Sequence, residues 1–325
     1  MRMKSRLRRL MGLERRPATQ TPESLLSAVQ SLPGVQAGCT LSISREGAWL
    51  DLPSGVSLRY ESGFNSVTGT VLQLGSFEEH ELQLVVGRLQ AGAVMMDVGA
   101  NVGLFSIFAA LTVPGVVVHA FEPVPATFAS LEANLKRNRV AEQVVTHQVA
   151  VSESNGMVHI TTDFHSSNYL VAQDSTQSTV RVPMITIDSC AASSGLTRLD
   201  FIKIDVEGRE LSALRGGIQS IRRFKPDLLV EIFEKPSQFH DRTMEPRDAI
   251  LKLMTELGYD IHVIGDDGRL LTLAQFDRAS SAMSYHNYMF IHPDCEHRRP
   301  VRLIDHSGAA AGKSSGLGSS HLLPG

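Results

Sequence analysis

The chain has 325 residues, of which 42% are hydrophobic and 20% charged. These proportions exclude an intrinsically disordered chain, collagen, a coiled coil and a polytopic membrane protein, and the length suits one large α/β domain with appendages or two small domains. The formal net charge is −3, but residues 1–16 hold seven of the basic side chains and one acidic one, which leaves the remainder at −9. Because so acidic a body offers no electrostatic footprint for nucleic acid, we expect no nucleic-acid partner.

The cysteines and the terminal segment bear on the cellular compartment. Cys39, Cys190 and Cys295 are odd in number and form no CxxC pair, so we expect neither a disulfide framework nor a thiolate zinc site, and a reducing cytoplasm fits best. Residues 1–22 form a basic leader without a following apolar core, which is unlike a secretory signal, and they are expected to be flexible. The stretch 104–121 is the most apolar, but a proline-glycine pair interrupts it, so we expect no transmembrane segment.

Residues 23–76 are expected to form a β-rich extension ahead of the main domain. From Leu41 to Val71, β-branched and alternating segments, among them WLDL, VSLRY and VTGTVLQL, are separated by turn residues, which is typical of short antiparallel strands. Between Phe77 and Leu89 apolar residues recur every three or four positions, and acidic residues stand in the first turn, where the helix dipole favours them. We expect this helix to introduce the main domain.

The main domain, residues 77–295, alternates apolar segments of strand length with segments of helical period. The strand-like segments are AVMMDVG, VVVHAFEP, QVVTHQVAV, FIKID, DLLVEIF, YDIHVIG and YMFIH, and the helical segments include NVGLFSIFAAL, ATFASLEANLKRN, ELSALRGGIQSI and AILKLMTELG. This alternation predicts a doubly wound, mostly parallel α/β sheet of seven strands, with its ligand crevice at the carboxyl ends of the strands. Between the third and fourth core strands, residues 152–190 read as a β insertion around the turn Asn155-Gly156. The Gly/Ser/Ala-rich tail, residues 296–325, is expected to be disordered.

The strongest motif is DVGANVG, at the point where a buried strand turns into a helix. Its glycines, Gly99 and Gly103, allow a tight turn and a close approach to a ligand, and the helix amino end offers free N–H groups. The motif departs from the GxGxxG fingerprint, which argues against a nicotinamide dinucleotide. Glu122 ends the next strand, 25 residues after Asp97, where an acidic side chain can accept hydrogen bonds from ribose hydroxyls. A plain helix cap and a solvated strand end are the alternative interpretation of these residues.

A second group of charged residues, KIDVEG, opens the second half of the sheet. In an extended segment Lys203, Asp205 and Glu207 would share one face, and charges on a central strand are costly unless they are paired or lie at its open end. The two acids would then reach the crevice, and an ion pair between Lys203 and one of them is compatible with that role. Glu231 in LLVEIF and the pair His286-Asn287 before YMFI are further polar groups at strand ends.

In these segments the chain resembles the FkbM family of S-adenosylmethionine-dependent methyltransferases. The resemblance rests on SFEEHELQLV ahead of MMDVGANVGLFS, and on AFEPVPATFASLEANLKRN, AVSESNG, VPMITIDSC, FIKIDVEGRELSALRGG, DLLVEIFE and HNYMF, over residues 77–290. It implies a class I, Rossmann-like methyltransferase sheet, with the DVGAN loop around the methionine part of the cofactor, Glu122 at the ribose and the turn 149–152 near the adenine. The implied cofactor-binding residues are Asp97, Gly99, Asn101, Gly103, Glu122, Pro123, Ala150 and Asp205.

Methyl transfer is an in-line displacement, so the protein has to align the acceptor and help remove its proton. Alignment can supply about 7–11 kcal/mol, and a positioned base adds about 10²–10⁴-fold in rate. We expect Asp205 and Glu207 near the methyl group, with Glu207 as the candidate base and His286 as the second choice. Asp205, Glu207 and Glu231 could instead hold a magnesium ion, although nothing in the sequence supports a metal over plain solvation. Two residues of the insertion, His165 and Asn168, are candidates for contact with the acceptor.

The expected activity is O-methylation of a hydroxyl on a sugar, a glycan or another natural product. Amine and carboxyl acceptors stay open, because the motifs describe the donor side. The competing class is a non-catalytic nucleoside-binding subunit with a regulatory or scaffolding role, which would keep the DVGAN loop but would not need the second charged group. The presence of Lys203, Asp205 and Glu207 beside an intact loop favours the enzyme. A nicotinamide-dependent oxidoreductase would require the missing GxGxxG.

Overall fold

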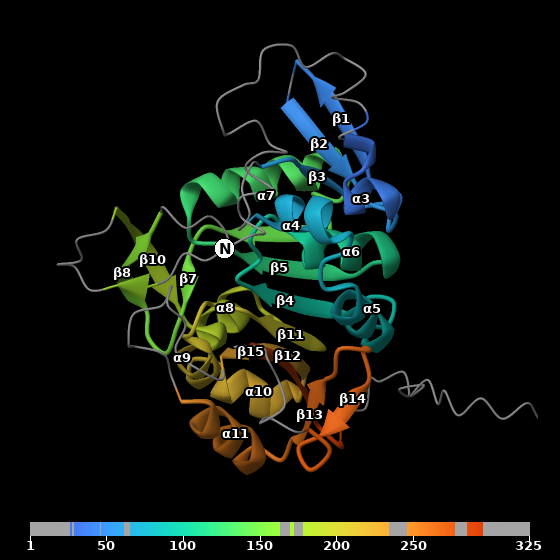
Figure 1. Ribbon diagram of the computed structural model, residues 1–325. Helices are drawn as coiled ribbons and strands as arrows, with labels where there is room; N and C mark the ends of the chain where they lie inside the picture. The colour runs from blue at the N-terminus through green and yellow to red at the C-terminus, as the bar shows by residue number, and fades with distance from the viewer. Residues whose placement is uncertain are drawn as a thin grey trace, which may run out of the picture.

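The structure is a computed structural model of the chain, and it describes residues 27, 29–45, 47–61, 66–162, 170–171, 178–233, 246–276 and 285–294. These residues form a central eight-stranded sheet, a three-stranded N-terminal sheet and a four-stranded sheet that stands apart on the left of Figure 1. Helices cover both faces of the central sheet. No helix in the described ranges is both long and apolar enough to cross a membrane.

The central sheet is mostly parallel, as the alternation of strands and helices predicts. Its order is β14 (Leu270–Thr272), β13 (Asp260–Ile264), β15 (Tyr285–Ile291), β12 (Asp227–Phe233), β11 (Phe201–Ile204), β4 (Val94–Val98), β5 (Val117–Phe121) and β6 (Val144–His147). Strands β12, β11, β4, β5 and β6 are mutually parallel, and β15 lies antiparallel between β12 and β13. The chain reverses its direction of sheet growth between β4 and β11, so a switch point of the kind that binds ligands lies at the carboxyl ends of these two strands.

The sheet has eight strands where the sequence predicts seven. The additional strand is β14, which pairs antiparallel with β13 through Ile264↔Leu270. Gly268, at a φ of +77°, lies in the turn between the two strands. β14 has three residues and shows no alternation of its own, so its pairing follows from this turn rather than from a strand signal.

Two helical layers enclose the sheet. One layer holds α5 (Glu79–Arg88), α6 (Leu104–Thr112) and α7 (Pro125–Arg137), and the other holds α8 (Ile187–Ser193), α9 (Glu210–Arg215), α10 (Ile218–Phe224) and α11 (Arg247–Glu256). Side chains of β4 alternate between the two layers, with Met95 packed in the first core and Met96 in the second, both fully buried. This burial on both faces explains why the strand reads as a continuous apolar run.

The N-terminal extension contains the antiparallel strands β1 (Thr40–Ser44), β2 (Gly47–Asp51) and β3 (Ser57–Arg59), and the helices α3 (Pro33–Gln36) and α4 (Val67–Leu74). The strand predicted for VTGTVLQL is wrong, because this segment is α4. Its N-terminus is capped by Ser66, whose hydroxyl oxygen accepts from the backbone N–H of Gly69 at 3.0 Å. Burial at Val67, Val71 and Leu72 follows a helical period, so packing decides against the β-branched composition.

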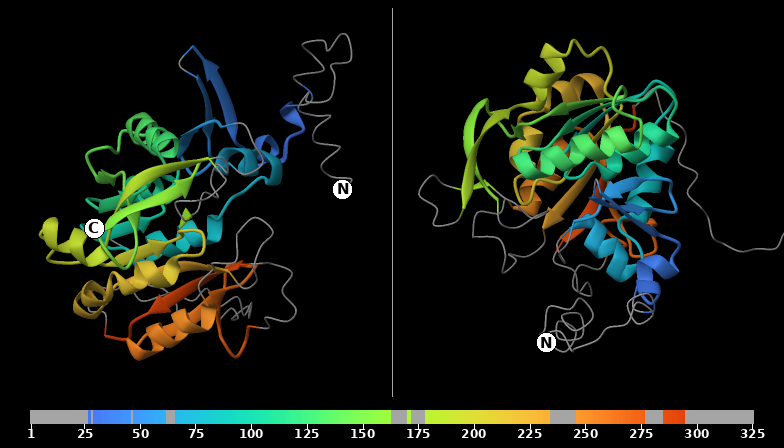
Figure 2. Two further views of the ribbon diagram at one scale, coloured as in Figure 1. Left: turned by 90° about the vertical axis from the view of Figure 1, so that its left-hand side faces the viewer. Right: turned by 90° about the horizontal axis from the view of Figure 1, so that it is seen from above.

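One further segment of the main domain differs from the sequence interpretation. The single helix predicted over ELSALRGGIQSI is divided into α9 and α10, because the consecutive residues Gly216 and Gly217 leave the helix and pack closely against Ser152 and Ile187. Between β6 and α8 the chain forms a separate sheet of β7 (Ala150–Val151), β10 (Thr179–Ile185), β8 (Gly156–Thr161) and β9 (Leu170–Val171). Figure 2 shows this sheet and the N-terminal sheet on different sides of the central sheet.

Helix α7 joins the N-terminal sheet to the switch-point loop through asparagine side chains. The buried Asn134 accepts from the backbone N–H of Arg59 on β3 at 2.7 Å and donates to the carbonyl of Val102 at 2.8 Å. Asn138 bonds both the N–H and the carbonyl of Ser57 in the same way. The loop after β4 is therefore held from the side of the N-terminal extension.

Candidate active site

The loop after β4 makes the sharp turn that its glycines predict. Gly99 has a φ of +77°, and a Cβ at this position would collide with the carbonyl oxygen of Asp205. The N–H groups of Gly99 and Ala100 both donate to the carbonyl of Phe121, at 3.0 and 2.9 Å. Glycine is thus needed here because the loops after β4 and β11 pass each other at the switch point.

The second half of the loop leads into helix α6. Asn101 adopts a left-handed conformation with a φ of +52°, and Gly103 precedes the first helical residue with a φ of +89°. A Cβ on Gly103 would meet the side chain of Leu131 on α7. The helix-cap interpretation of Gly103 is therefore correct, and the predicted contacts of Asn101 and Gly103 with a cofactor stay predictions.

Glu122, at the end of β5, links two loops at the carboxyl edge of the sheet. Its carboxylate accepts from the N–H of Asn101 at 3.1 Å and from the N–H of Val124 at 2.8 Å. Burial raises the pKa of Glu122 to about 7, although both hydrogen bonds act in the opposite direction. Pro123, between Glu122 and Val124, leads the chain into α7. Ala150 lies in a small apolar cluster with Val124.

Lys203 on β11 is the buried cation at the centre of this edge. Its ammonium donates to the carbonyl of Gly99 at 3.0 Å and to the carboxylate of Asp205 at 3.1 Å, and it lies 3.9 Å from Asp97. Burial opposes the charged form of Lys203, but Asp205, Asp97 and Glu78 outweigh it and raise the pKa of the amine. The ion pair that the sequence allows between Lys203 and a neighbouring acid is present.

Asp97 is fully buried at the end of β4 and faces the same edge. One carboxylate oxygen accepts from the hydroxyl of Ser106 at 2.6 Å, and the other has no hydrogen-bond donor. Burial raises the pKa of Asp97, and Lys203 and Ser106 counteract this shift. Asp97 therefore anchors the start of α6 to the strand, while its other oxygen, Oδ1, faces the ammonium of Lys203 at 3.9 Å.

The segment after β11 is not extended through Glu207 as the sequence suggests. The strand ends at Ile204, and Glu207 has a left-handed φ of +55°. The turn is held by Glu210, whose carboxylate accepts from the N–H groups of Val206 at 3.3 Å and Gly208 at 2.9 Å. Burial raises the pKa of Glu210 to about 8. Sequence reasoning missed this role because Glu210 looks like an ordinary acid in the first turn of a helix.

Two more carboxylates lie within electrostatic reach of Asp205. Glu78 directly precedes α5 and has a φ of +51°. Burial and the charge of Asp205 raise the pKa of Glu78 to about 8, because together they exceed the opposing effect of Lys203. The pKa of Glu231 on β12 is raised well above its ordinary value by burial and then by Asp205 and Glu207. Glu78 stands 127 residues ahead of Asp205, so no local spacing indicates their proximity.

Strand β15 sends its two polar residues to opposite faces of the sheet. Asn287 pairs with Glu231 in register and donates to Glu81 on α5 at 3.0 Å. His286 pairs with Ile232 and packs edge-on against the ring of Phe276, at a centroid distance of 4.7 Å. His286 therefore lies on the face away from Glu231, and its role as a base stays a prediction.

The insertion residues His165 and Asn168 lie outside the described residues. At the carboxyl edge itself, the described side chains place Lys203 among an excess of carboxylates: Glu78, Asp97, Glu122, Asp205, Glu207, Glu210 and Glu231. Burial and neighbouring carboxylates raise the pKa values of five of these acids, and a positively charged ligand would counteract this effect: Glu78, Asp97, Glu122, Glu210 and Glu231. The arrangement thus suits a cationic ligand that also carries hydroxyl groups for Glu122.

The chain is similar in sequence to known methyltransferases. The family profile of the methyltransferase FkbM domain matches residues 97–261, just over half of the chain. The chain is 34% identical over 159 residues to the 31-O-demethyl-FK506 methyltransferase FkbM of Streptomyces tacrolimicus, covering 39% of this chain and 60% of that protein, so it spans less than two thirds of this relative. It is 26% identical over 179 residues to the hexuronic acid methyltransferase AglP of Haloferax volcanii, covering 55% of this chain and 68% of that protein.

Among solved structures, the methyltransferase FkbM from Methylobacillus flagellatus KT shares 21% sequence identity at a TM-score of 0.40, covering 62% of this chain and 44% of that chain. The strand order with its switch point between β4 and β11 is that of a methyltransferase-like α/β fold with a mostly parallel central sheet. On the match of its profile to residues 97–261, the chain belongs to the FkbM methyltransferase domain family.

Proposed function

We propose that this protein is an S-adenosylmethionine-dependent O-methyltransferase that acts on a hydroxyl of a sugar, a glycan or another natural product, and that residues 77–295 are its catalytic unit. The observation that carries the proposal is the meeting of the loop after β4, Glu122 and the Lys203–Asp205 pair at one edge of the sheet. Family membership supports methyl transfer. The names of two relatives, a 31-O-demethyl-FK506 and a hexuronic acid methyltransferase, favour a natural-product or sugar acceptor.

The residues at this edge fit the proposed cofactor. When bound, S-adenosylmethionine supplies a methyl group on a positively charged sulfur. Glu122 uses two of its acceptor positions for backbone N–H groups and has others left for ribose hydroxyls. The excess of acids around Lys203 suits the positive charges of a sulfonium and an ammonium group.

The acceptor's proton has to leave as the new bond forms, and the proposal assigns this step to the acids after β11. Asp205 is the more accessible partner of Lys203, with 28% of its side chain exposed, and Lys203 holds its carboxylate in one orientation. We assign Glu207 as the base, next to Asp205 in the left-handed turn. Glu78 is a second candidate, because a pKa of about 8 is close to the working pH.

The test is transfer of a labelled methyl group from S-adenosylmethionine to a panel of hydroxylated sugars and polyketides. Asp205→Asn keeps the size of the side chain but removes its charge, and we expect turnover to fall about 100-fold or more, because a positioned carboxylate is lost. Asp260→Asn, at the exposed start of β13, is the matched control and should be unaffected. Normal turnover of folded Asp205→Asn would remove this residue from the mechanism, and cofactor binding without turnover on any acceptor would favour a scaffolding role.

A further inference from the structure

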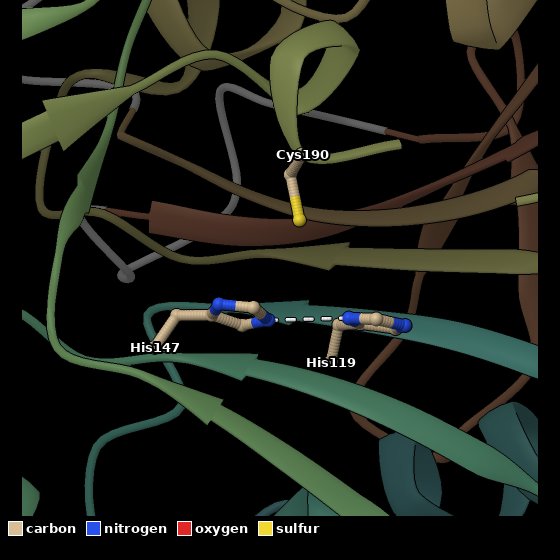
Figure 3. A group of neighbouring side chains, drawn as sticks. All are labelled: His119, His147 and Cys190. Atoms are coloured by element: carbon tan, nitrogen blue, oxygen red, sulfur yellow. Dashed lines mark hydrogen bonds between the residues drawn. The ribbon is translucent and has the colours of Figure 1, made fainter. Parts of the chain in front are cut away.

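A cluster of two histidines and a cysteine lies between the sheet and helix α8 (Figure 3). His119 comes from the middle of β5, His147 from the end of β6, and Cys190 from α8, which packs on this face of the sheet. The ligand atoms of the three side chains all lie within 4.8 Å of one another. Three separate elements thus bring three metal-ligating side chains to one point.

The two histidine rings lie side by side and are hydrogen-bonded to each other. His119 Nδ1 and His147 Nε2 are 3.1 Å apart, and the ring planes are nearly parallel, with an interplanar angle of 13°. Phe121 stacks on His147 at a centroid distance of 4.6 Å, which fixes the plane of that ring. Figure 3 shows the sulfur of Cys190 pointing from its helix toward the pair.

The three side chains differ in exposure and in the direction of their pKa shifts. His119 and Cys190 are buried, and His147 is partly exposed. Burial lowers the pKa of His119, and burial together with His119 lowers the pKa of His147 to about 4, whereas burial raises the pKa of Cys190 and favours its thiol. A neutral imidazole has the lone pair that a metal ion needs, and a thiol becomes a ligand once a metal displaces its proton.

We propose that His119, His147 and Cys190 form a binding site for a zinc-class divalent transition-metal ion. Two nitrogens at about 2.05 Å from a tetrahedral zinc lie roughly 3.3 Å apart, close to the separation of the two ring nitrogens, and a Zn–S bond of about 2.3 Å brings the thiolate within a small side-chain adjustment. Imidazole and thiolate together select zinc over magnesium or calcium. Because His147 is partly exposed, a fourth coordination position would be left for water.

An ion at this point would connect β5 and β6, which lead into the candidate cofactor site, with helix α8. The carbonyl of His147 accepts from the N–H of Glu122 at 3.1 Å, so His147 adjoins the acid proposed for the ribose. The ion would link the middle of β5 and the end of β6 to α8 and keep Glu122 in place. The ion would have no part in the chemistry of methyl transfer, although it would support the acid proposed for the ribose.

The experiment uses the full chain, stripped of metal by a chelator and titrated with Zn²⁺ in competition with a chromophoric chelator. We expect about one tightly bound ion per chain, and a melting temperature that rises when zinc is added. His147→Gln and Cys190→Ser should each weaken binding by about tenfold or more and abolish the rise in melting temperature. Cys39→Ser and His262→Gln change a buried cysteine and a histidine outside the cluster and should bind as the parent does.

Cobalt substitution provides a second readout that does not depend on activity. Co²⁺ bound through a thiolate gives a sulfur-to-cobalt charge-transfer band, which we expect in the parent and in Cys39→Ser but not in Cys190→Ser. His147→Gln changes the more exposed histidine, so it serves as the histidine variant if His119→Gln fails to fold. Zinc binding that is equal in all folded variants, or absent from the parent, would overturn the proposal and leave a hydrogen-bonded histidine pair. Cofactor titration of the same variants distinguishes this outcome from failure of the methyltransferase assignment.

Discussion

Lys203 is the residue on which the electrostatics of the carboxyl edge depend. It is 6% exposed, bonds the carbonyl of Gly99 and the carboxylate of Asp205, and offsets the charge of Asp97. A buried charge without its partner costs several kcal/mol, so the acids and the lysine are stable only together. Lys203 therefore holds the loops after β4 and β11 in position as well as the charges.

We predict that Lys203→Met lowers the free energy of unfolding by about 3–5 kcal/mol, because methionine fills the space but leaves Asp97 buried beside uncompensated acids. Urea denaturation followed by circular dichroism measures this change. Lys252→Met is the control, since Lys252 is exposed on α11 and its i,i+4 pair with Glu256 should be worth about 0.5 kcal/mol or less. Equal stability of Lys203→Met and the parent would show that Lys203 does not stabilise the folded protein in this way.

The sequence motifs found one part of the site and missed another for a physical reason. Asp97, Glu122 and Asp205 stand at the ends of strands, and a strand end is readable from the apolar run before it. Glu78 and Glu210 lie at the starts of helices, where acids are common because they interact favourably with the helix dipole. Their proximity to Asp205 therefore has no signature in the sequence. Only the packing of α5 and α9 around β11 brings them near Asp205.

At the scale of elements, helix α7 is the connection between the N-terminal sheet and the loop after β4. Asn134, fully buried, satisfies the N–H of Arg59 and the carbonyl of Val102 at once. A buried backbone group that loses its partner costs about 1–3 kcal/mol. The packing of the N-terminal extension against the main domain therefore depends on a few amide side chains.

We predict that Asn134→Ala destabilises the protein by about 2–4 kcal/mol, because two buried backbone groups lose their partners. Chemical denaturation gives the value, and hydrogen exchange should show faster exchange at β3. Lys136→Ala, exposed on the same helix, controls for the change in helix propensity and should stay within about 0.5 kcal/mol of the parent. If Asn134→Ala is as stable as Lys136→Ala, the hydrogen bonds of Asn134 contribute nothing to the stability of the protein.

The elements that sequence reasoning misjudged are those decided by tertiary contacts. VTGTVLQL has the composition of a strand, but Ser66 caps it as helix α4 and its buried positions follow the helical period. The glycine pair that divides α9 from α10 passes too close to Ser152 and Ile187 for side chains. The long strands β4, β5 and β12 were predictable, because burial on both faces leaves a continuous apolar run.

At the scale of the whole molecule, the buried acids make stability depend on pH. The pKa values of Glu78 and Glu210 are raised to about 8 and that of Glu122 to about 7, above an ordinary value of 4.5. The folded state therefore binds more protons than the unfolded state in this range, and stability falls as pH rises toward 8. The lowered pKa values of His119 and His147 act in the opposite direction, but only below their ordinary value of 6.5.

We predict that the ligand-free protein loses stability between pH 6.5 and pH 8, on the order of 1 kcal/mol per buried acid. Thermal melting across this range measures the slope. Glu210→Gln keeps an oxygen for the N–H groups of Val206 and Gly208 and should flatten the slope, whereas the exposed Glu153→Gln should leave it unchanged. A slope that is flat, or that rises with pH, would contradict the account of the acids.

Calorimetric titration of the purified chain tests whether the carboxyl edge binds S-adenosylmethionine. The protein is titrated with S-adenosylmethionine and separately with NADH, and both titrations are repeated on Glu122→Ala, with circular dichroism as the control for folding. The account predicts a dissociation constant on the order of micromolar for S-adenosylmethionine, no heat with NADH, and loss of binding in the variant. Absence of S-adenosylmethionine binding to the folded parent, or unchanged binding in Glu122→Ala, would contradict it.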